Sequence, residues 1–98
     1  MSSGAANAAQ AKLSEAAFFS VHARAEPGVM PRILEFFAKR GLVPSCWHSA
    51  VCATDRQHLT IEIEIDGLDP YVTDYIAACL RQIVSVETVL TIPRDHRH

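Results

Sequence analysis

Ninety-eight residues with nine basic and eleven acidic side chains, a formal net charge of -2 and 49% hydrophobic residues are enough for one domain with a modest core. No run of like charges favours nucleic-acid phosphates or anionic lipid, and no apolar run reaches the roughly 20 residues that cross a bilayer, so neither nucleic acid nor membrane is an expected partner. Three cysteines without a Cys-x-x-Cys spacing indicate a cytoplasmic protein rather than a disulfide framework.

Both ends of the chain are expected to lie outside the domain. Residues 1–16 read as a flexible, Ala- and Ser-rich leader, and residues 94–98 read as a flexible tail. The leader lacks the basic start and the continuous apolar stretch of a secretory signal. The domain is therefore predicted over residues 17–93.

The first strand and the first helix meet at a Pro-Gly turn. Residues 18–25 alternate between apolar and polar side chains, which predicts a half-buried strand, and residues 26–28 end it. Apolar residues then recur at helical spacing: Val29, Ile33, Phe36 and Phe37. Pro31 stands in the first turn, where a missing amide hydrogen costs nothing, and Gly41 is placed to cap the far end.

The next two segments have the pattern of strands. An extended segment is predicted over residues 42–53, and residues 54–57 form a turn. Aliphatic and polar side chains then alternate strictly: Leu59, Ile61, Ile63 and Ile65 against Thr60, Glu62, Glu64 and Asp66. A sheet covered on both faces would read as continuously apolar, so this alternation predicts one covered face and one polar face.

A second helix and a fourth strand complete the order. Residues 66–70 break the third strand, and Asp69 is a candidate N-cap. The expected buried stripe of the helix is Val72, Ile76, Leu80 and Ile83. A strand over residues 85–92 follows, and Pro93 stops it. This order predicts an α+β fold, a ferredoxin-like βαββαβ sandwich with a four-stranded antiparallel sheet and two helices on one face.

The side chains disfavour three known uses of this scaffold. An RNA-recognition module needs stacking aromatics on the open face of its sheet, where residues 60–66 carry acidic side chains. A soft-metal carrier needs a Cys-x-x-Cys in the first loop, and an acyl-phosphate hydrolase needs a basic residue there. The first loop contains Glu26, Pro27 and Gly28 instead.

No catalytic site, metal site or cofactor is expected. Cys46, His48 and Cys52 share one side of the second strand, but a single strand cannot wrap three ligands tetrahedrally around zinc. Glu62 and Glu64 are neighbours on the outer side of a strand, which is typical of a solvated surface. The alternative hypothesis is a small enzyme that uses this acidic face. No serine, cysteine or histidine constellation resembles an activated nucleophile.

The segment E-P-G-V-M-P-R-I-L-E-F-F-A-K-R-G-L, residues 26–42, resembles the first loop and helix of the ACT domain, a small regulatory module that binds amino acids. More narrowly, it is similar to the short small subunits of acetohydroxyacid synthase, also called acetolactate synthase. The resemblance extends over residues 18–92, with the same order of elements throughout.

The resemblance implies a non-catalytic regulatory subunit. Such a subunit pairs with a second copy into a continuous sheet and associates with the thiamine-diphosphate-dependent catalytic large subunit of acetolactate synthase in branched-chain amino-acid biosynthesis. A free-standing amino-acid-binding ACT sensor that acts on another partner is the alternative.

The resemblance also implies a ligand site at the first loop. An amino-acid carboxylate, from valine, leucine or isoleucine, can lie against the free amides at the start of the helix, and Gly28 leaves room for it. The implied binding residues are Ala25, Glu26, Pro27, Gly28, Val29, Met30, Val43, Pro44 and Ser45. Ala25 and Val43 stand where valine-binding members tend to carry asparagine. Losing two hydrogen bonds of about 1.5–3 kcal/mol each predicts weak or absent valine binding.

Overall fold

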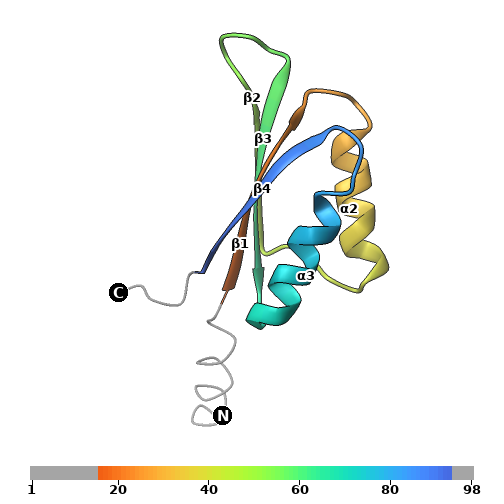
Figure 1. Cartoon of the computed structure of the whole chain (residues 1–98), viewed down its shortest axis with the longest axis vertical. Helices are drawn as coiled ribbons and strands as arrows, with labels where there is room; N and C mark the ends of the chain where they lie inside the picture. The colour runs from red at the N-terminus through yellow and green to blue at the C-terminus, as the bar shows by residue number, and fades with distance from the viewer. Residues whose placement is uncertain (1–15, 94–98) are drawn as a thin grey trace.

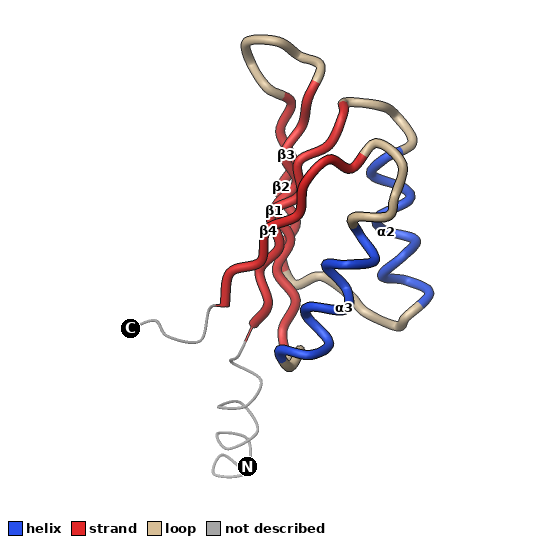
Figure 2. The backbone as a smooth tube through the Cα atoms, viewed as in Figure 1, coloured by secondary structure: helices blue, strands red, loops and turns tan. Residues whose placement is uncertain are grey.

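Two helices cover one face of a four-stranded antiparallel sheet in the computed structural model, which describes residues 16–93 (Figure 1). The elements follow in the order β1 (Ala16–Arg24), α2 (Val29–Lys39), β2 (Cys46–Val51), β3 (His58–Asp66), α3 (Pro70–Leu80) and β4 (Val86–Pro93). Both helices lie on the same side of the sheet, whose strand order is β2-β3-β1-β4 (Figure 2). The predicted ferredoxin-like βαββαβ fold is therefore confirmed. The predicted leader and tail lie outside the described residues, apart from Ala16, which begins β1.

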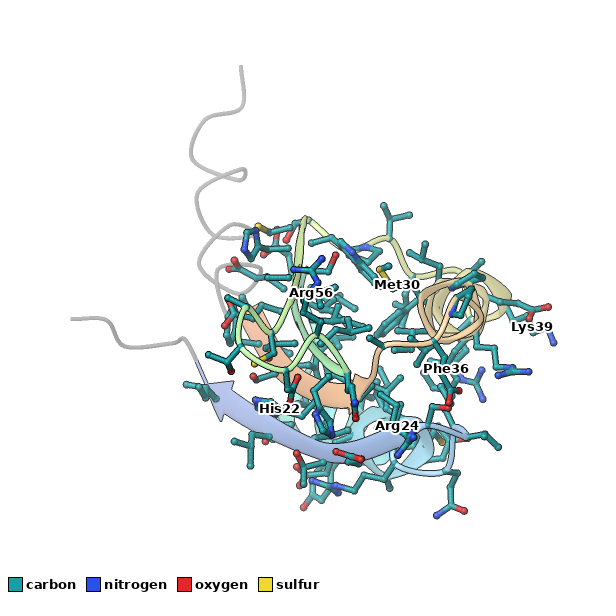
Figure 3. All side chains as sticks on the ribbon, turned by 90° about the horizontal axis from the view of Figure 1, so that it is seen from above. His22, Arg24, Met30, Phe36, Lys39 and Arg56 are labelled. Carbon is teal, nitrogen blue, oxygen red and sulfur yellow. The ribbon has the colours of Figure 1, made fainter. Side chains whose placement is uncertain are left out.

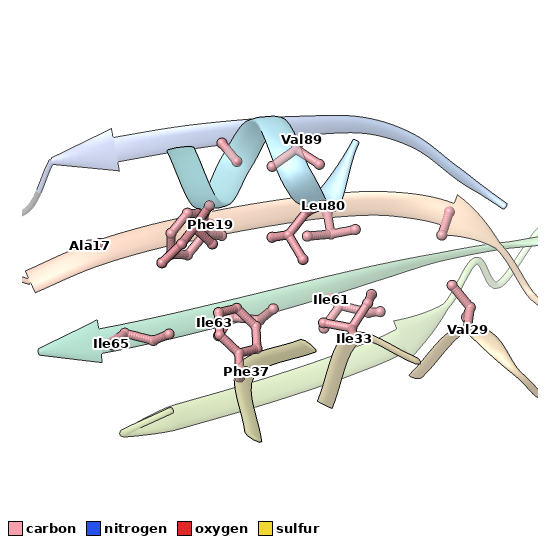
Figure 4. Close-up of a cluster of buried hydrophobic side chains, with 14 of the residues drawn as sticks. Ala17, Phe19, Val29, Ile33, Phe37, Ile61, Ile63, Ile65, Leu80 and Val89 are labelled. Atoms are coloured by element: carbon pink, nitrogen blue, oxygen red, sulfur yellow. The ribbon is translucent and has the colours of Figure 1, made fainter. Parts of the chain in front are cut away.

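The two central strands, β1 and β3, supply most of the core. Phe19 lies opposite Ile63 and Val21 lies opposite Ile61 in the antiparallel register, and all four side chains are fully buried beneath the helices (Figure 4). The intervening residues face the other side of the sheet, as the alternation of the sequence predicts. A slip of one residue between these strands would exchange the apolar and polar faces, so this pattern specifies the register.

The first helix, α2, has the predicted amphipathic form. Val29, Ile33 and Phe37 are buried against the sheet, whereas Lys39 points away from it (Figure 3). Gly41 has a φ of 71°, a left-handed conformation that glycine adopts without steric cost, and its amide donates to the last turn of the helix. The predicted glycine cap is confirmed.

The second strand is shorter than the sequence suggests. Instead of residues 42–53, β2 spans Cys46–Val51. The backbone amide of Leu42 closes the end of α2 by donating to the Phe37 carbonyl at 2.9 Å, so Leu42 cannot belong to a strand. Local hydrogen bonds at the helix end therefore shorten β2 at its start.

The second helix, α3, begins as predicted at Asp69, whose Oδ1 accepts a hydrogen bond of 2.9 Å from the Val72 amide. Its buried stripe consists of Ile76, Ala77 and Leu80. The expected inward position of Val72 is wrong, because the buried face extends to Ala77 on the side away from Val72, which is 40% exposed.

The other face of the sheet is covered by no helix in the described part of the chain. Glu62 and Glu64 of β3 lie on it, as predicted. Among residues 16–93, no helix is long and apolar enough to cross a membrane.

Candidate functional site

Two backbone hydrogen bonds fix the position of the loop between β1 and α2. The Arg24 amide donates to the Ser85 carbonyl at 2.9 Å, and the Ala25 amide donates to the Gln57 carbonyl at 2.8 Å. Ser85 precedes β4 and Gln57 belongs to the turn between β2 and β3. The loop therefore rests on two turns that are distant in the sequence.

The carboxylate of Glu26 is held by its own chain. Ser85 Oγ donates a hydrogen bond to Glu26 Oε1, and Arg24 Nε lies 3.5 Å from Glu26 Oε2. Ser85 has a φ of 82°, in the left-handed region that serine rarely adopts and that costs of order 1–3 kcal/mol. These contacts leave Glu26 less available to a ligand ammonium than its position in the loop suggests.

At the start of α2, some backbone amides donate to no acceptor in the described part of the chain. The amides of Val29 and Arg32 bond back to carbonyls of the loop, and Pro31 has no amide hydrogen. The amides of Gly28 and Met30 have no hydrogen-bond partner among residues 16–93. Free donors at a helix N-terminus, together with the helix dipole, attract an anion.

A positive side chain lies beside these donors. The Arg32 guanidinium would be 3.6 Å from a Cβ atom placed on Gly28, and no other group of the described chain lies within 4 Å of that position besides the same guanidinium. Gly28 itself has a φ of -84°, so its backbone does not require glycine. Two free amides with a guanidinium beside Gly28 are the chemistry that a carboxylate needs.

The residues predicted to bind a ligand fall into two groups. Residues 25–30 lie together at the start of α2, whereas Val43, Pro44 and Ser45 follow its far end. An eleven-residue helix is about 16 Å long, and the Ser45 amide donates at 2.8 Å to the Glu64 carbonyl near the distant end of β3. One chain therefore does not bring the two groups together.

Sequence reasoning missed the residues that support the loop: Arg24, Arg32, Gln57 and Ser85. The position of Arg32 in the first turn of the helix was a readable signal, because a cation there lies next to a bound anion. Ser85 offered no such signal, since it lies 59 residues from Glu26 and acts through an unusual φ.

A cluster of Asp55, His58 and Glu87 is linked to the same loop through Gln57. His58 Nδ1 lies 2.9 Å from Asp55 Oδ2, and His58 Nε2 lies 3.6 Å from Glu87 Oε1. The Gln57 amide donates to Asp55 Oδ1 at 2.8 Å, while the Gln57 carbonyl accepts from the loop. The hydrogen bond to Asp55 raises the pKa of His58, and the Gln57 amide, followed by His58, lowers the pKa of Asp55.

We expect this cluster to make stability depend on pH. The pKa of His58 is higher in the folded chain than its ordinary value near about 6.5. Protonated His58 therefore contributes its full share to the free energy of unfolding below that ordinary pKa. This contribution is lost as the pH rises through the raised pKa of the folded chain. Urea unfolding between about pH 6 and pH 8 should show this decline in the wild type and a smaller decline in His58→Gln.

The matched control for this experiment is His48→Gln on β2, since none of the ion pairs found in residues 16–93 includes His48. The control should retain the wild-type pH dependence. Equal pH dependence in the wild type and in His58→Gln would contradict the role of His58.

The cysteines and histidines of β2 do not converge on one point. Cys46 and His48 face the open side of the sheet, whereas Cys52 follows the strand and its Sγ lies 3.2 Å from Thr54 Oγ1. That hydrogen bond, with the neighbouring backbone amides, lowers the pKa of the Cys52 thiol. Within residues 16–93, no group of three His, Cys, Asp or Glu side chains is arranged to hold a metal ion.

Comparison with known proteins identifies a family and a set of similar folds. The sequence profile of the ACT-like domain matches residues 9–98. A search of curated protein sequences finds no match. The ACT domain from GTP pyrophosphokinase of Chlorobium tepidum is 17% identical, with a TM-score of 0.66 over 79% of this chain and 96% of that one.

Two further structures share the fold at similarly low identity. The C-terminal domain of the MgtC protein from Mycobacterium tuberculosis is 16% identical, with a TM-score of 0.64 over 84% of this chain and 89% of that one. The regulatory subunit of aspartate kinase from Thermus flavus is 12% identical, with a TM-score of 0.65 over 81% of this chain and 52% of that one.

Proposed function

The chain belongs to the ACT-like domain family, a family of regulatory modules, and we propose that it is the non-catalytic regulatory subunit of a larger enzyme. The observation that carries this proposal is the pair of free amides, Gly28 and Met30, beside the Arg32 guanidinium. These donors suit a carboxylate at the start of α2. The ligand class that follows is a small amino acid.

The surroundings of these donors argue for weak binding of that amino acid. Its ammonium group needs acceptors, but Ala25 offers no side-chain oxygen and Glu26 is already held by Arg24 and Ser85. Val43 likewise offers only methyl groups. We therefore propose that valine, leucine and isoleucine bind weakly or not at all, and that the subunit supports its enzyme with little feedback by valine.

A second copy of the chain would complete the site. If the edge strand β2 pairs with its own copy in antiparallel fashion, the start of one β2 lies opposite the end of the other. The end of β2 lies at the same end of the sheet as Ala25, which bonds to the β2–β3 turn. Residues 43–45 of the second copy would then approach residues 25–30 of the first. A homodimer formed by sheet extension thus unites the two groups of predicted binding residues.

The partner enzyme that we propose is the thiamine-diphosphate-dependent catalytic subunit of acetolactate synthase. Support comes from residues 26–42, whose Pro-Gly-Val turn, basic helix end and glycine resemble the short small subunits of that enzyme. A free-standing amino-acid sensor is the second candidate, because the free amides beside Arg32 could bind a carboxylate without any partner enzyme.

Calorimetry and enzyme assays separate the two candidates. A supporting subunit should give little or no saturable heat with valine, leucine or isoleucine, and should change the activity of an acetolactate synthase catalytic subunit severalfold when the two are mixed. Saturable binding of an amino acid without any effect on that activity would favour the sensor. Unchanged activity together with absent binding would contradict both proposals.

If an amino acid binds, the substitution Gly28→Ala, which adds a single methyl group, tests whether it binds at the start of α2. Gly28→Ala places a Cβ in the space next to the free amides, where only the flexible Arg32 side chain lies nearby. The circular dichroism spectrum should therefore be unchanged, whereas amino-acid binding at this position should weaken. Unchanged binding in Gly28→Ala would place the ligand elsewhere.

A further inference from the structure

Two of the three cysteines stand at the two ends of the edge strand β2. Cys46 is its first residue and Cys52 directly follows its last, so Ser49 lies midway between them. The backbone of Cys52 continues the strand, because its amide donates to the His58 carbonyl at 2.8 Å. Alternate residues of a strand face the same side, so both cysteines face the side of the sheet that no helix of residues 16–93 covers.

These two cysteines cannot form a disulfide within one chain. A strand rises about 3.3 Å per residue, so the Cα atoms of Cys46 and Cys52 are about 20 Å apart. A disulfide requires Cα atoms about 4.4–6.8 Å apart. Both cysteines are free in the structure, Cys46 exposed and Cys52 half-buried. A disulfide between them therefore requires a second copy of the chain.

The backbone of β2 selects one register for that second copy. Residues that bond to β3 alternate with residues whose backbone groups face the open edge, and these outward residues are Trp47, Ser49 and Val51. An antiparallel pair with its twofold axis at Ser49 brings Ser49 opposite Ser49 and Trp47 opposite Val51, so every outward residue is paired. An axis moved to His48 or Ala50 leaves one outward residue of each strand unpaired.

The register with its axis at Ser49 also brings Cys46 opposite Cys52 of the second copy. The two residues form a non-hydrogen-bonded pair, in which the Cα atoms are about 4.5 Å apart, within the range of a disulfide. We propose that Cys46 of each copy forms a reversible disulfide with Cys52 of the other, two per dimer. This inference rests on the homodimer proposed above, which forms through β2.

Cys52 is suited to react first with an oxidant. The Thr54 hydroxyl and the neighbouring backbone amides lower the pKa of the Cys52 thiol, and the thiolate is the reactive form. The Cys52 thiolate attacks a small disulfide, such as oxidised glutathione, to form a mixed disulfide and release one thiolate. Cys46 of the second copy loses its proton to solvent, attacks Cys52 Sγ and releases the second thiolate. Two protein thiols are thus oxidised, and one small disulfide is reduced to two thiols.

Each of these disulfides would join the two groups of predicted ligand-binding residues. Cys46 directly follows residues 43–45. Cys52 precedes the β2–β3 turn, in which the Gln57 carbonyl accepts a hydrogen bond from the loop between β1 and α2. Oxidation therefore holds residues 43–45 of one copy beside residues 25–30 of the other. The proposed amino-acid site would be held together in the oxidised dimer and free to separate in the reduced one.

Non-reducing electrophoresis of the full chain tests this pairing after incubation with oxidised glutathione. The wild type should form a covalent dimer that dithiothreitol reverses. Cys46→Ser and Cys52→Ser should each form at least about tenfold less of it, because every remaining thiol then lies opposite a serine. An equal mixture of the two variants, combined before oxidation, should regain the covalent dimer, since one Cys46 then lies opposite one Cys52. Cys79→Ser on α3 is the control and should behave as the wild type.

Sedimentation in a reducing buffer separates this proposal from the homodimer itself. A reduced dimer that Ser49→Pro dissociates, but that oxidised glutathione does not link covalently, would support pairing through β2 and overturn the disulfide. A covalent dimer that persists in Cys46→Ser or in Cys52→Ser would also overturn it, because that dimer would not link Cys46 to Cys52. A chain that is monomeric when reduced and forms no covalent dimer when oxidised would overturn both proposals.

Discussion

Replacing Phe37 by alanine is expected to lower the free energy of unfolding by about 3–5 kcal/mol. The Phe37 side chain is 1% exposed, and its ring centroid lies 6.3 Å from that of Phe19 on β1 (Figure 4). Phe37 is thus the contact through which α2 is anchored on the centre of the sheet. Its removal leaves a cavity between two rigid elements that cannot close around it.

The adjacent residue is the matched control. Phe36 lies at the edge of the core, with the Arg40 guanidinium 3.8 Å from the centroid of its ring, and it remains partly exposed. Phe36→Ala should therefore cost only about 1–2 kcal/mol. Thermal unfolding should show a drop in Tm of at least about 12 °C for Phe37→Ala and a much smaller one for Phe36→Ala. Equal losses would mean that α2 is not held by Phe37 in particular.

The same buried positions explain why much of the fold was predictable. The period-two pattern of Leu59, Ile61, Ile63 and Ile65 and the 3.6-residue pattern of Ile33 and Phe37 are local, and local periodicity determines which face of an element is buried. Gly41 and Asp69 act within a few residues of their own helix ends. The order of the helices and strands could therefore be predicted from residue patterns within each element.

Two predictions were wrong, the start of β2 and the burial of Val72, and they depend on a hydrogen bond at a helix end and on a small shift of packing. Leu42 looks like a strand residue, yet its amide completes the end of α2. Val72 has the correct spacing for the buried stripe of α3, but Ala77 faces the sheet in a way that rotates Val72 outward. Spacing alone does not distinguish two stripes that differ by a fraction of a helical turn.

The candidate site was predictable to a similar degree. Residues 26–28 and the amides that follow them could be identified from the turn and the helix start. The hydrogen bond from Ser85 to Glu26 could not be identified, because it joins residues 59 positions apart and depends on a serine with a left-handed backbone conformation. The separation of residues 43–45 from the loop was also hidden, since it requires knowing that they follow the far end of α2.

The proposed homodimer depends on the backbone groups at the free edge of β2. The Cys52 amide donates to the His58 carbonyl at 2.8 Å across the continuing β2–β3 register, and the residues that bond to a neighbouring antiparallel strand alternate. Val51, Ser49 and Trp47 consequently direct their backbone groups away from β3. These groups are the ones that a second β2 would pair with.

Ser49→Pro removes one of these outward amides without removing a hydrogen bond within the chain, so the monomer should keep its fold. By the twofold symmetry, two interface hydrogen bonds are lost, each leaving an unsatisfied carbonyl that costs about 1–3 kcal/mol. Dimerisation through β2 should weaken at least about 30-fold, measured by sedimentation equilibrium.

Thr91→Pro on β4 is the matched control, because the same alternation directs the Thr91 amide away from β1 at the other edge of the sheet. Dimerisation through β4 instead of β2 would reverse the two results, with Thr91→Pro dissociating the dimer and Ser49→Pro leaving it intact. That outcome would also separate residues 43–45 of one copy from residues 25–30 of the other. The amino-acid site would then have to function with the amides of Gly28 and Met30 and the Arg32 guanidinium of a single chain.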